Sequence, residues 1–139
     1  MITLPNAHRD AISRHGEADY PEECCGLLIG TFGEDGARTV TDLLPISNAR
    51  ESAARHNRFL IEPLDMLRGE RHARALGRDV VGIYHSHPNS PAVPSQFDLD
   101  HAWPVYSYII VSVTADGAGD LQSWTLRADR SGFDAETIE

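Results

Sequence analysis

His85 and His87 end an apolar run and are separated by a single residue, which is the spacing of a metal-binding pair on a strand. Side chains at positions i and i+2 of an extended strand leave the same face, so both imidazoles point the same way. Asp98 follows after a loop, in the expected first turn of a helix for which Ser95 is the N-cap. Two histidines and one carboxylate leave one position of a tetrahedral zinc open. The pattern therefore predicts a catalytic zinc site rather than a structural one.

Amide hydrolysis at such a site also needs a base that takes a proton from water and returns it to the leaving amine. Glu22 and Glu23 lie directly before the apolar run that begins at Cys24, and both are candidates for this base. The alternative is that both acids are solvated residues at the strand edge, and the residue pattern alone favours neither interpretation. A lone His-x-His pair is also compatible with a purely structural role.

The elements that must position these residues indicate a mixed α/β fold. A central mixed β-sheet is expected, flanked by two longer helices, with one short helix after the metal-binding loop. Hydrophobic periodicity and flanking prolines and glycines place helices at 5–16, 63–76 and 95–102. Gly69, inside the second helix, indicates close packing there. Strands are expected at 2–4, 24–32, 38–46, 58–61, 79–86, 106–113 and 121–127, and the tail after 131 either adds an edge strand or frays.

Length and composition are those of a single globular domain covering residues 1–139. The formal net charge of −9 argues against general nucleic-acid binding. The N-terminal residues show no signal-peptide pattern, and no apolar stretch is long enough to cross a membrane, so we expect a cytoplasmic protein without membrane association. Cys24 and Cys25 are adjacent, and we expect two buried, reduced thiols rather than a disulfide or a reactive pair.

Three further features leave alternatives. All twelve basic residues are arginine, and seven of them lie in residues 50–78 against four acids. This segment is either a solvated helix face or a docking patch for an acidic partner. His101 is either solvated or a neighbour that supports the metal ligands. Trp103 and Trp124 are expected to anchor the core rather than to form a binding platform.

The chain resembles the JAMM, or MPN-plus, metalloprotease family, and most of all its small bacterial members. The signature of that family is an upstream glutamate, then His-x-His-Pro, six residues, and Ser-x-x-Asp. Residues 85–88 and 95–98 match this spacing without departure. In the family the glutamate stands seven residues before a glycine that ends the apolar strand, so Gly30 selects Glu23 rather than Glu22. The resemblance extends from the first helix to the strand that contains Trp124.

This resemblance implies a cytidine-deaminase-like JAMM/MPN fold and a zinc-dependent metallopeptidase or isopeptidase. It implies that His85, His87 and Asp98 bind Zn²⁺. Glu23 would hold the water in the fourth position and act first as general base and then as general acid. Ser95 would donate a hydrogen bond to the oxyanion of the tetrahedral intermediate.

The substrate that the resemblance implies is an amide bond at the C-terminal Gly-Gly of a ubiquitin-like or sulfur-carrier protein. The tail of that protein would lie extended beside a sheet edge. Residues 47–61 would form the wall of the groove, and Arg50, Arg55 and Arg58 would meet the acidic surface of the partner. The preference between peptidase and isopeptidase activity stays open, as does a homodimer.

Two other functions share this fold or motif. MPN-type scaffold modules have the same fold without metal ligands, and the intact ligand set of this chain argues against that role. RadC-like proteins, which are associated with DNA repair, have a similar His-x-His-Pro motif. The acidic balance of the chain, together with the lack of an extra helical DNA-binding domain in these residues, argues against a RadC-like protein.

Overall fold

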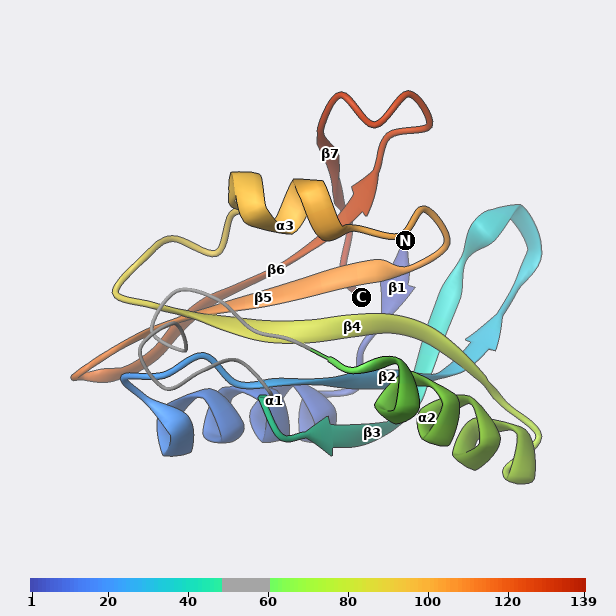
Figure 1. Cartoon of the computed structure of the whole chain (residues 1–139), viewed down its shortest axis with the longest axis horizontal. Helices are drawn as coiled ribbons and strands as arrows, with labels where there is room; N and C mark the ends of the chain where they lie inside the picture. The colour runs from blue at the N-terminus through green and yellow to red at the C-terminus, as the bar shows by residue number, and fades with distance from the viewer. Residues whose placement is uncertain (49–60) are drawn as a thin grey trace.

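A computed structural model describes residues 1–48 and 61–139 of the chain (Figure 1). Most of the predicted wall of the groove at 47–61 lies outside these described residues, as do Arg50, Arg55 and Arg58 and most of the predicted strand at 58–61. The elements follow in the order β1 (Ile2–Thr3), α1 (Asn6–Asp19), β2 (Cys25–Phe32), a short 3-10 turn (Glu34–Gly36), β3 (Arg38–Ile46), α2 (Pro63–Ala75), β4 (Asp79–Pro88), α3 (Gln96–His101), β5 (Ser107–Thr114), β6 (Gly117–Leu126) and β7 (Phe133–Glu136).

The strands form one mixed sheet in the order β1-β3-β2-β4-β5-β6-β7, with β4 at its centre. β4 pairs antiparallel with β2 and parallel with β5, and the connection from β4 to β5 carries α3. The parallel pair needs such a crossover, because a tight hairpin joins only antiparallel strands. The predicted mixed α/β architecture is confirmed, and the tail adds the edge strand β7.

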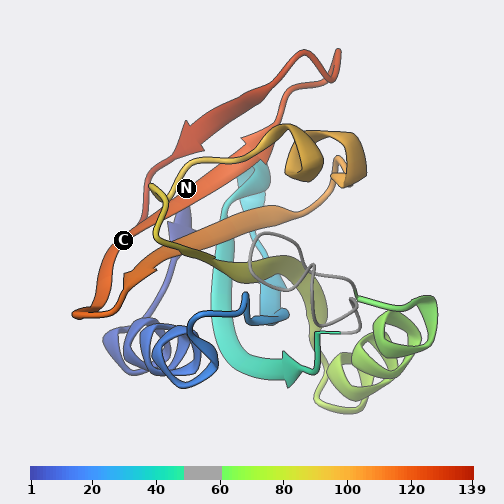
Figure 2. The same ribbon diagram turned by 60° about the vertical axis from the view of Figure 1, so that its left-hand side comes forward.

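The two longer helices cover opposite faces of the sheet, and Figure 2 shows them on either side of β2 and β3. Ile12 of α1 packs with Tyr84 and Val111 on one face. Ala73 of α2 packs with Leu27 and Ile83 on the other face, which α3 also covers through partly buried Leu99. Each face thus has its own apolar cluster, and the second face carries the candidate site.

The sequence predicted that Gly16 ends the first helix. α1 instead continues to Asp19. A Cβ at Gly16 would lie 2.9 Å from the side chain of Val113 and 3.3 Å from the Cβ of Ser86. Glycine is needed here because the helix lies close against β4 and β5, so its role is packing rather than termination.

The sequence predicted that β4 ends at Ser86, before Pro88. The strand instead runs through Pro88. The Ser86 amide donates to Cys24 on the β2 side, whereas the Asn89 amide donates to Val113 on the β5 side. Backbone amides of a strand point alternately to its two neighbours, so the nitrogen of Pro88, like that of Ser86, faces the β2 side. Proline has no amide hydrogen, but at this position the β2–β4 ladder has already ended, so no hydrogen bond is lost. The pairing with β5 therefore continues without loss.

Other element ends differ from the prediction by a few residues. β6 begins at Gly117 instead of residue 121, because a tight turn after Thr114 returns the chain at once. α3 begins at Gln96, with Ser95 as its N-cap as predicted. In the described ranges, no helix is long and apolar enough to cross a membrane.

Candidate metal centre

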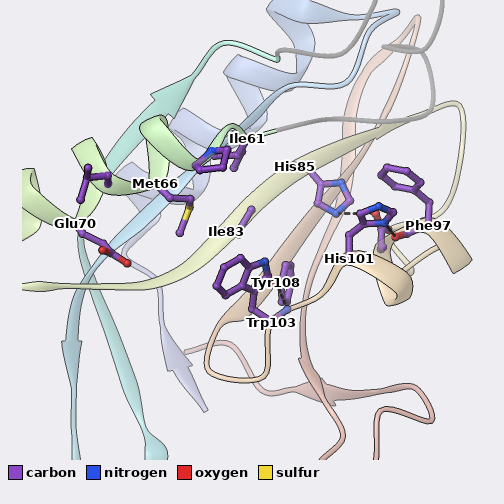
Figure 3. A pocket seen from close by; sticks show the side chains of 12 residues that line it. Ile61, Met66, Glu70, Ile83, His85, Phe97, His101, Trp103 and Tyr108 are labelled. Atoms are coloured by element: carbon purple, nitrogen blue, oxygen red, sulfur yellow. Dashed lines mark hydrogen bonds and ion pairs between the residues drawn. The ribbon is translucent and has the colours of Figure 1, made fainter.

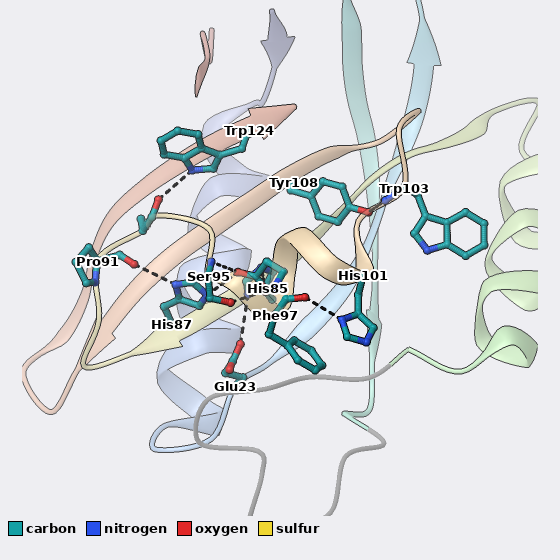
Figure 4. A network of polar contacts seen from close by, with 12 residues as sticks. Glu23, His85, His87, Pro91, Ser95, Phe97, His101, Trp103, Tyr108 and Trp124 are labelled. Atoms are coloured by element: carbon teal, nitrogen blue, oxygen red, sulfur yellow. Dashed lines mark hydrogen bonds and ion pairs between the residues drawn. The ribbon is translucent and has the colours of Figure 1, made fainter. Parts of the chain in front are cut away.

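His85 and His87 leave the same face of β4, as their spacing predicts. Their ring centroids lie 4.8 Å apart, and both side chains are buried. His87 Nδ1 lies 3.1 Å from the carbonyl oxygen of Pro91 (Figure 4). Because a carbonyl oxygen only accepts, Nδ1 of His87 carries the proton of the neutral ring, and Nε2 is left as the ligand nitrogen.

Asp98 is placed by the first turn of α3. The Ser95 amide donates to Asp98 Oδ2 at 2.8 Å, and the Asp98 amide donates to Ser95 Oγ at 3.1 Å, so the two residues form a reciprocal cap. This cap turns the buried carboxylate toward β4, where it lies 3.1 Å from His87 Nε2 and 3.7 Å from His85 Nε2. The Nε2 atoms of both histidines therefore face the same carboxylate.

Glu23 reaches the site from the residues before β2. Cys25 pairs directly with His85 across the β2–β4 ladder, and Glu23, two residues earlier, points to the same face. Its Oε1 lies 3.4 Å from His85 Nδ1, and the side chain is buried. Glu23 Oε2 is also buried and has no hydrogen-bond partner within residues 1–48 and 61–139. A buried carboxylate oxygen without a partner is costly, which favours a functional role for Glu23.

Three hydrogen bonds fix the backbone at Glu23 and Cys24. The Asn48 side-chain amide donates to the Glu23 carbonyl at 3.1 Å. The Cys24 amide donates to the Ser86 hydroxyl at 2.8 Å, and the Ser86 amide donates back to the Cys24 carbonyl at 3.2 Å. Ser86 is fully buried on the face of β4 opposite the two histidines. The strand that presents the histidines thus also holds the peptide that follows Glu23.

The site favours a positive charge between its side chains. Burial on its own raises the pKa of the Asp98 carboxyl, but the charge of His85 and the hydrogen bonds from His87 and Ser95 outweigh burial and hold this pKa well below its ordinary value. Burial lowers the pKa of His87, but the hydrogen bond to Asp98, the negative charge of Asp98 and the hydrogen bond to Pro91 together outweigh burial and raise this pKa above its ordinary value. A cation between these groups would be stabilised by the same charges.

The donor atoms have spacings that suit a metal ion. Two ligands of a tetrahedral zinc, each about 2.1 Å from the ion, lie about 3.4 Å from one another. The distances of 3.1 Å and 3.7 Å from Asp98 to His87 and His85 bracket this value. Glu23, His85 and His87 also offer donor atoms that all lie within 4.8 Å of one another. The residues fit a metal, and two carboxylates approach the histidines from different sides.

An apolar pocket of about 310 Å³ opens from the site (Figure 3). His85 and Asp98 form part of its wall, and α2, β4, β5 and the residues around α3 supply the rest. Its other lining residues are Ile61, Pro63, Met66, Leu67, Glu70, Ile83, Phe97, His101, Trp103 and Tyr108.

Trp103 corrects the prediction that it anchors the core, because its side chain is 56% exposed and lines this pocket. The Trp103 amide donates to the Tyr108 hydroxyl at 2.7 Å, which holds the chain at the rim after α3 has ended. Trp124 is half-buried, and its indole donates to the Ala92 carbonyl at 3.0 Å. His101 is exposed and stacks on Phe97 at 4.1 Å between ring centroids, with no ion pair to Asp98 in the described part of the chain.

Sequence comparison decides the family. A family model described as "Prokaryotic homologs of the JAB domain" matches residues 5–127. The chain belongs to the JAB, or JAMM/MPN, family. Its fold is the one that the resemblance implied, and the chain is a hydrolase of the JAMM type.

Two sequence relatives and one solved structure show how similar the chain is to known proteins. A desampylase from Haloferax volcanii is 38% identical over 129 residues, which cover 89% of this chain and 88% of that protein. A CysO-cysteine peptidase from Mycobacterium tuberculosis is 30% identical over 84% of this chain and 77% of its own length. The solution structure of protein DSY2949 from Desulfitobacterium hafniense superposes with a TM-score of 0.86 at 32% identity, over 100% of this chain and 92% of that one.

The fold of this JAMM-family chain brings five predicted residues together. Glu23, His85, His87, Ser95 and Asp98 gather where β2, β4 and α3 meet, although they come from three separate segments. Sequence reasoning missed the contact of Ser86 with Cys24. It also missed the pocket, whose only sequence signal was the apolar side of α2. Cys24 and Cys25 are buried free thiols, as expected.

Proposed function

We propose that this chain is a zinc-dependent metallopeptidase or isopeptidase that hydrolyses an amide bond at the C-terminal Gly-Gly of a ubiquitin-like or sulfur-carrier protein. The observation that carries the proposal is the placement of His85 between two buried carboxylates, with Glu23 on its Nδ1 side and Asp98 on its Nε2 side. This arrangement separates a carboxylate suited to binding a metal from one suited to moving a proton.

His85, His87 and Asp98 would hold the zinc. The Nε2 atoms of both histidines face Asp98, so these three side chains would hold the ion and Glu23 would stay outside the set of protein ligands. When bound, zinc lowers the pKa of a coordinated water toward neutrality and polarises a carbonyl oxygen. An open fourth position among three protein ligands is the arrangement of catalytic zinc sites.

Glu23 would be the general base and then the general acid. It takes a proton from the attacking water as the new C–O bond forms, and it returns that proton to the amine nitrogen as the C–N bond breaks. Its buried position at the metal-facing end of β2 keeps the carboxylate close to the reacting atoms and away from bulk solvent. The hydrogen bond from the Cys24 amide to the Ser86 hydroxyl limits how far Glu23 can move.

Ser95 would donate to the oxyanion. Its Oγ accepts the Asp98 amide as the cap of α3, which uses a lone pair and leaves the hydroxyl hydrogen to donate. Ser95 is exposed, so the hydroxyl is open to a bound substrate. A donor at an oxyanion typically contributes about 3 kcal/mol to lowering the barrier.

The proposed substrate class rests on the relatives. One is named for cleaving CysO-cysteine, and a protease from Thermus thermophilus is described as cleaving TtuB-protein conjugates. A Gly-Gly tail suits the site, because glycines let a backbone come close to the metal ligands. Cytoplasmic location, the absence of nucleic-acid binding and a role for Arg50, Arg55 and Arg58 in the groove stay predictions.

The test is to incubate the zinc-loaded protein with ubiquitin-like and sulfur-carrier proteins that carry C-terminal extensions after Gly-Gly, and to measure intact mass. We expect at least one carrier to lose its extension directly after the second glycine. Replacing that Gly-Gly with Ala-Ala in the same carrier should block the loss. Intact extensions on every carrier would overturn the proposal. Zinc content near zero, with no loss of stability on chelation, would favour a scaffold module instead.

A further inference from the structure

The pocket beside the metal centre is apolar except for the groups at its two ends. His85 lies at one end, and Glu70 of α2 lies at the other (Figure 3). Asp98, with its Oδ1 3.7 Å from His85 Nε2, also lines the pocket. Ile83 and Tyr108 lie between these ends. Asp98 is held by His87 and by the Ser95 amide. Glu70 is therefore the one carboxylate of the described lining that is not part of the metal centre.

Glu70 is open to a new partner. It is exposed, and within residues 1–48 and 61–139 it makes no ion pair. Arg74 lies one helical turn further on but outside ion-pair distance. Glu70 also lines the neighbouring hollow, together with Arg38, Arg74 and Arg78. The charge of Glu70 acts on Tyr106 nearby, since it adds to burial in raising the pKa of that phenol. Tyr106 lines the neighbouring hollow, so the charge of Glu70 acts at the boundary between the two hollows.

The distance between the two ends can be counted along β4. Ile83 shares the face of His85 and lies two residues from it, about 6.6 Å along a strand. Glu70 shares the neighbouring hollow with Val80 and Tyr106. Because Tyr106 directly precedes Ser107, which pairs with Gly82, Glu70 lies near the level of residues 80–82. An extended substrate chain that ends at the metal centre would reach this level about three to five residues before the scissile bond.

We propose that the pocket is a specificity subsite in which Glu70 pairs with a basic side chain of the substrate tail, three to five residues before the scissile bond. This inference rests on the proposed function, because it places the Gly-Gly end of the tail at the metal centre. The apolar walls formed by Met66, Ile83 and Tyr108 take the aliphatic part of that basic side chain or its apolar neighbour. Glu70 itself is exposed, so the charge pair contributes specificity more than affinity.

Binding is measured separately from cleavage. The probe is a set of fluorescent peptides that end in Gly-Gly, with a single Arg or a single Glu at the second, third or fourth position before the last glycine, which is the third to fifth residue before the scissile bond, and neutral residues elsewhere. Each peptide is titrated into zinc-loaded Glu23→Gln protein, so that no cleavage competes. We expect the Arg peptide to bind about fivefold to tenfold more tightly than its Glu partner at one of these positions.

Charge reversal decides whether Glu70 is responsible. Glu70→Gln should remove the preference, and Glu70→Arg should invert it so that the Glu peptide binds better. Glu62→Gln is the matched control, because Glu62 is an exposed acid at the start of the same helix and lines neither hollow. The Glu62→Gln variant should prefer the Arg peptide to the same degree as the Glu23→Gln protein without a second substitution.

Three results would overturn the inference: no binding of any peptide, equal binding of Arg and Glu peptides, or an Arg preference that survives in Glu70→Gln. Its failure is distinct from failure of the proposed function, which is judged by cleavage of extended carriers by the unsubstituted protein. Cleavage without a charge preference removes the subsite alone. A charge preference without cleavage removes the hydrolytic function and leaves the subsite in place.

Discussion

The Ser86 hydroxyl accepts a hydrogen bond of 2.8 Å from the Cys24 amide, and this contact joins the strand of the two histidines to the peptide that follows Glu23. The β2–β4 ladder ends with Cys25 opposite His85, so the hydroxyl continues the pairing one residue further. The distance between the proposed base and the proposed metal ligands is therefore set in part by a residue that faces away from both.

Ser86→Ala should lower kcat about tenfold or more while KM and zinc content stay near their original values. The buried Cys24 amide would lose its acceptor, at a cost of about 1–3 kcal/mol, and Glu23 would lose its fixed position. Steady-state kinetics with zinc analysis, together with hydrogen exchange at the Cys24 amide, checks this. Ser123→Ala is the control, since Ser123 is a buried serine bonded to Glu136 far along β6. It should lose stability but keep kcat. An unchanged kcat in Ser86→Ala would remove the positioning role.

Gly69→Ala should destabilise the protein by about 1 kcal/mol, although alanine is the better helix former. A Cβ at Gly69 would collide with the end of the Leu27 side chain, which is fully buried, so Leu27 would have to shift within the core. The gain in helix propensity is about 1 kcal/mol, whereas overpacking a core costs about 1–3 kcal/mol. Urea unfolding measures the difference. Arg71→Ala, exposed on the same helix, should change the free energy of unfolding by less than about 0.5 kcal/mol. Equal or greater stability of Gly69→Ala would show that Leu27 yields.

Cys24 and Cys25 should resist alkylation in the native protein. Burial raises the pKa of Cys24 from 9.0 to about 12, and it also raises the pKa of Cys25. At pH 8 about one Cys24 thiol in ten thousand would be ionised, and only the thiolate reacts. Iodoacetamide followed by intact mass should give no adduct in buffer and two adducts in urea. Native alkylation at the rate of a free thiol would mean that this end of β2 opens readily.

Local rules were enough to predict where the side chains of the proposed metal ligands lie. The i, i+2 spacing on a strand placed His85 and His87 on one face, and N-cap chemistry placed Asp98 in the first turn of α3. Glu23 was different, because its nearness to His85 depends on the pairing of β2 with β4. The residue pattern alone left Glu22 and Glu23 as equal candidates, and only the family resemblance selected between them.

The features that sequence reasoning missed or misjudged depend on contacts between distant segments. Gly16 was taken as a helix end because proline and glycine bracket the segment, but it is a packing glycine against Val113. Trp103 was placed in the core by residue type, whereas the end of α3 leaves it at the pocket rim. The role of a large exposed apolar residue such as Trp103 can be assigned only when the neighbouring elements are known.

The most direct test of the central claim compares zinc content and cleavage in Glu23→Gln and Asp98→Ala. Both carboxylates are buried beside His85, but Glu23 is the proposed general base and Asp98 is a proposed zinc ligand. Zinc stoichiometry by elemental analysis, and cleavage of a Gly-Gly-extended carrier by intact mass, are measured on the same preparations. Glu23→Gln should hold one zinc per chain, as the unsubstituted protein does, and cleave nothing. Asp98→Ala should bind zinc at least tenfold more weakly. Full cleavage by Glu23→Gln, or full zinc affinity in Asp98→Ala, would contradict the account.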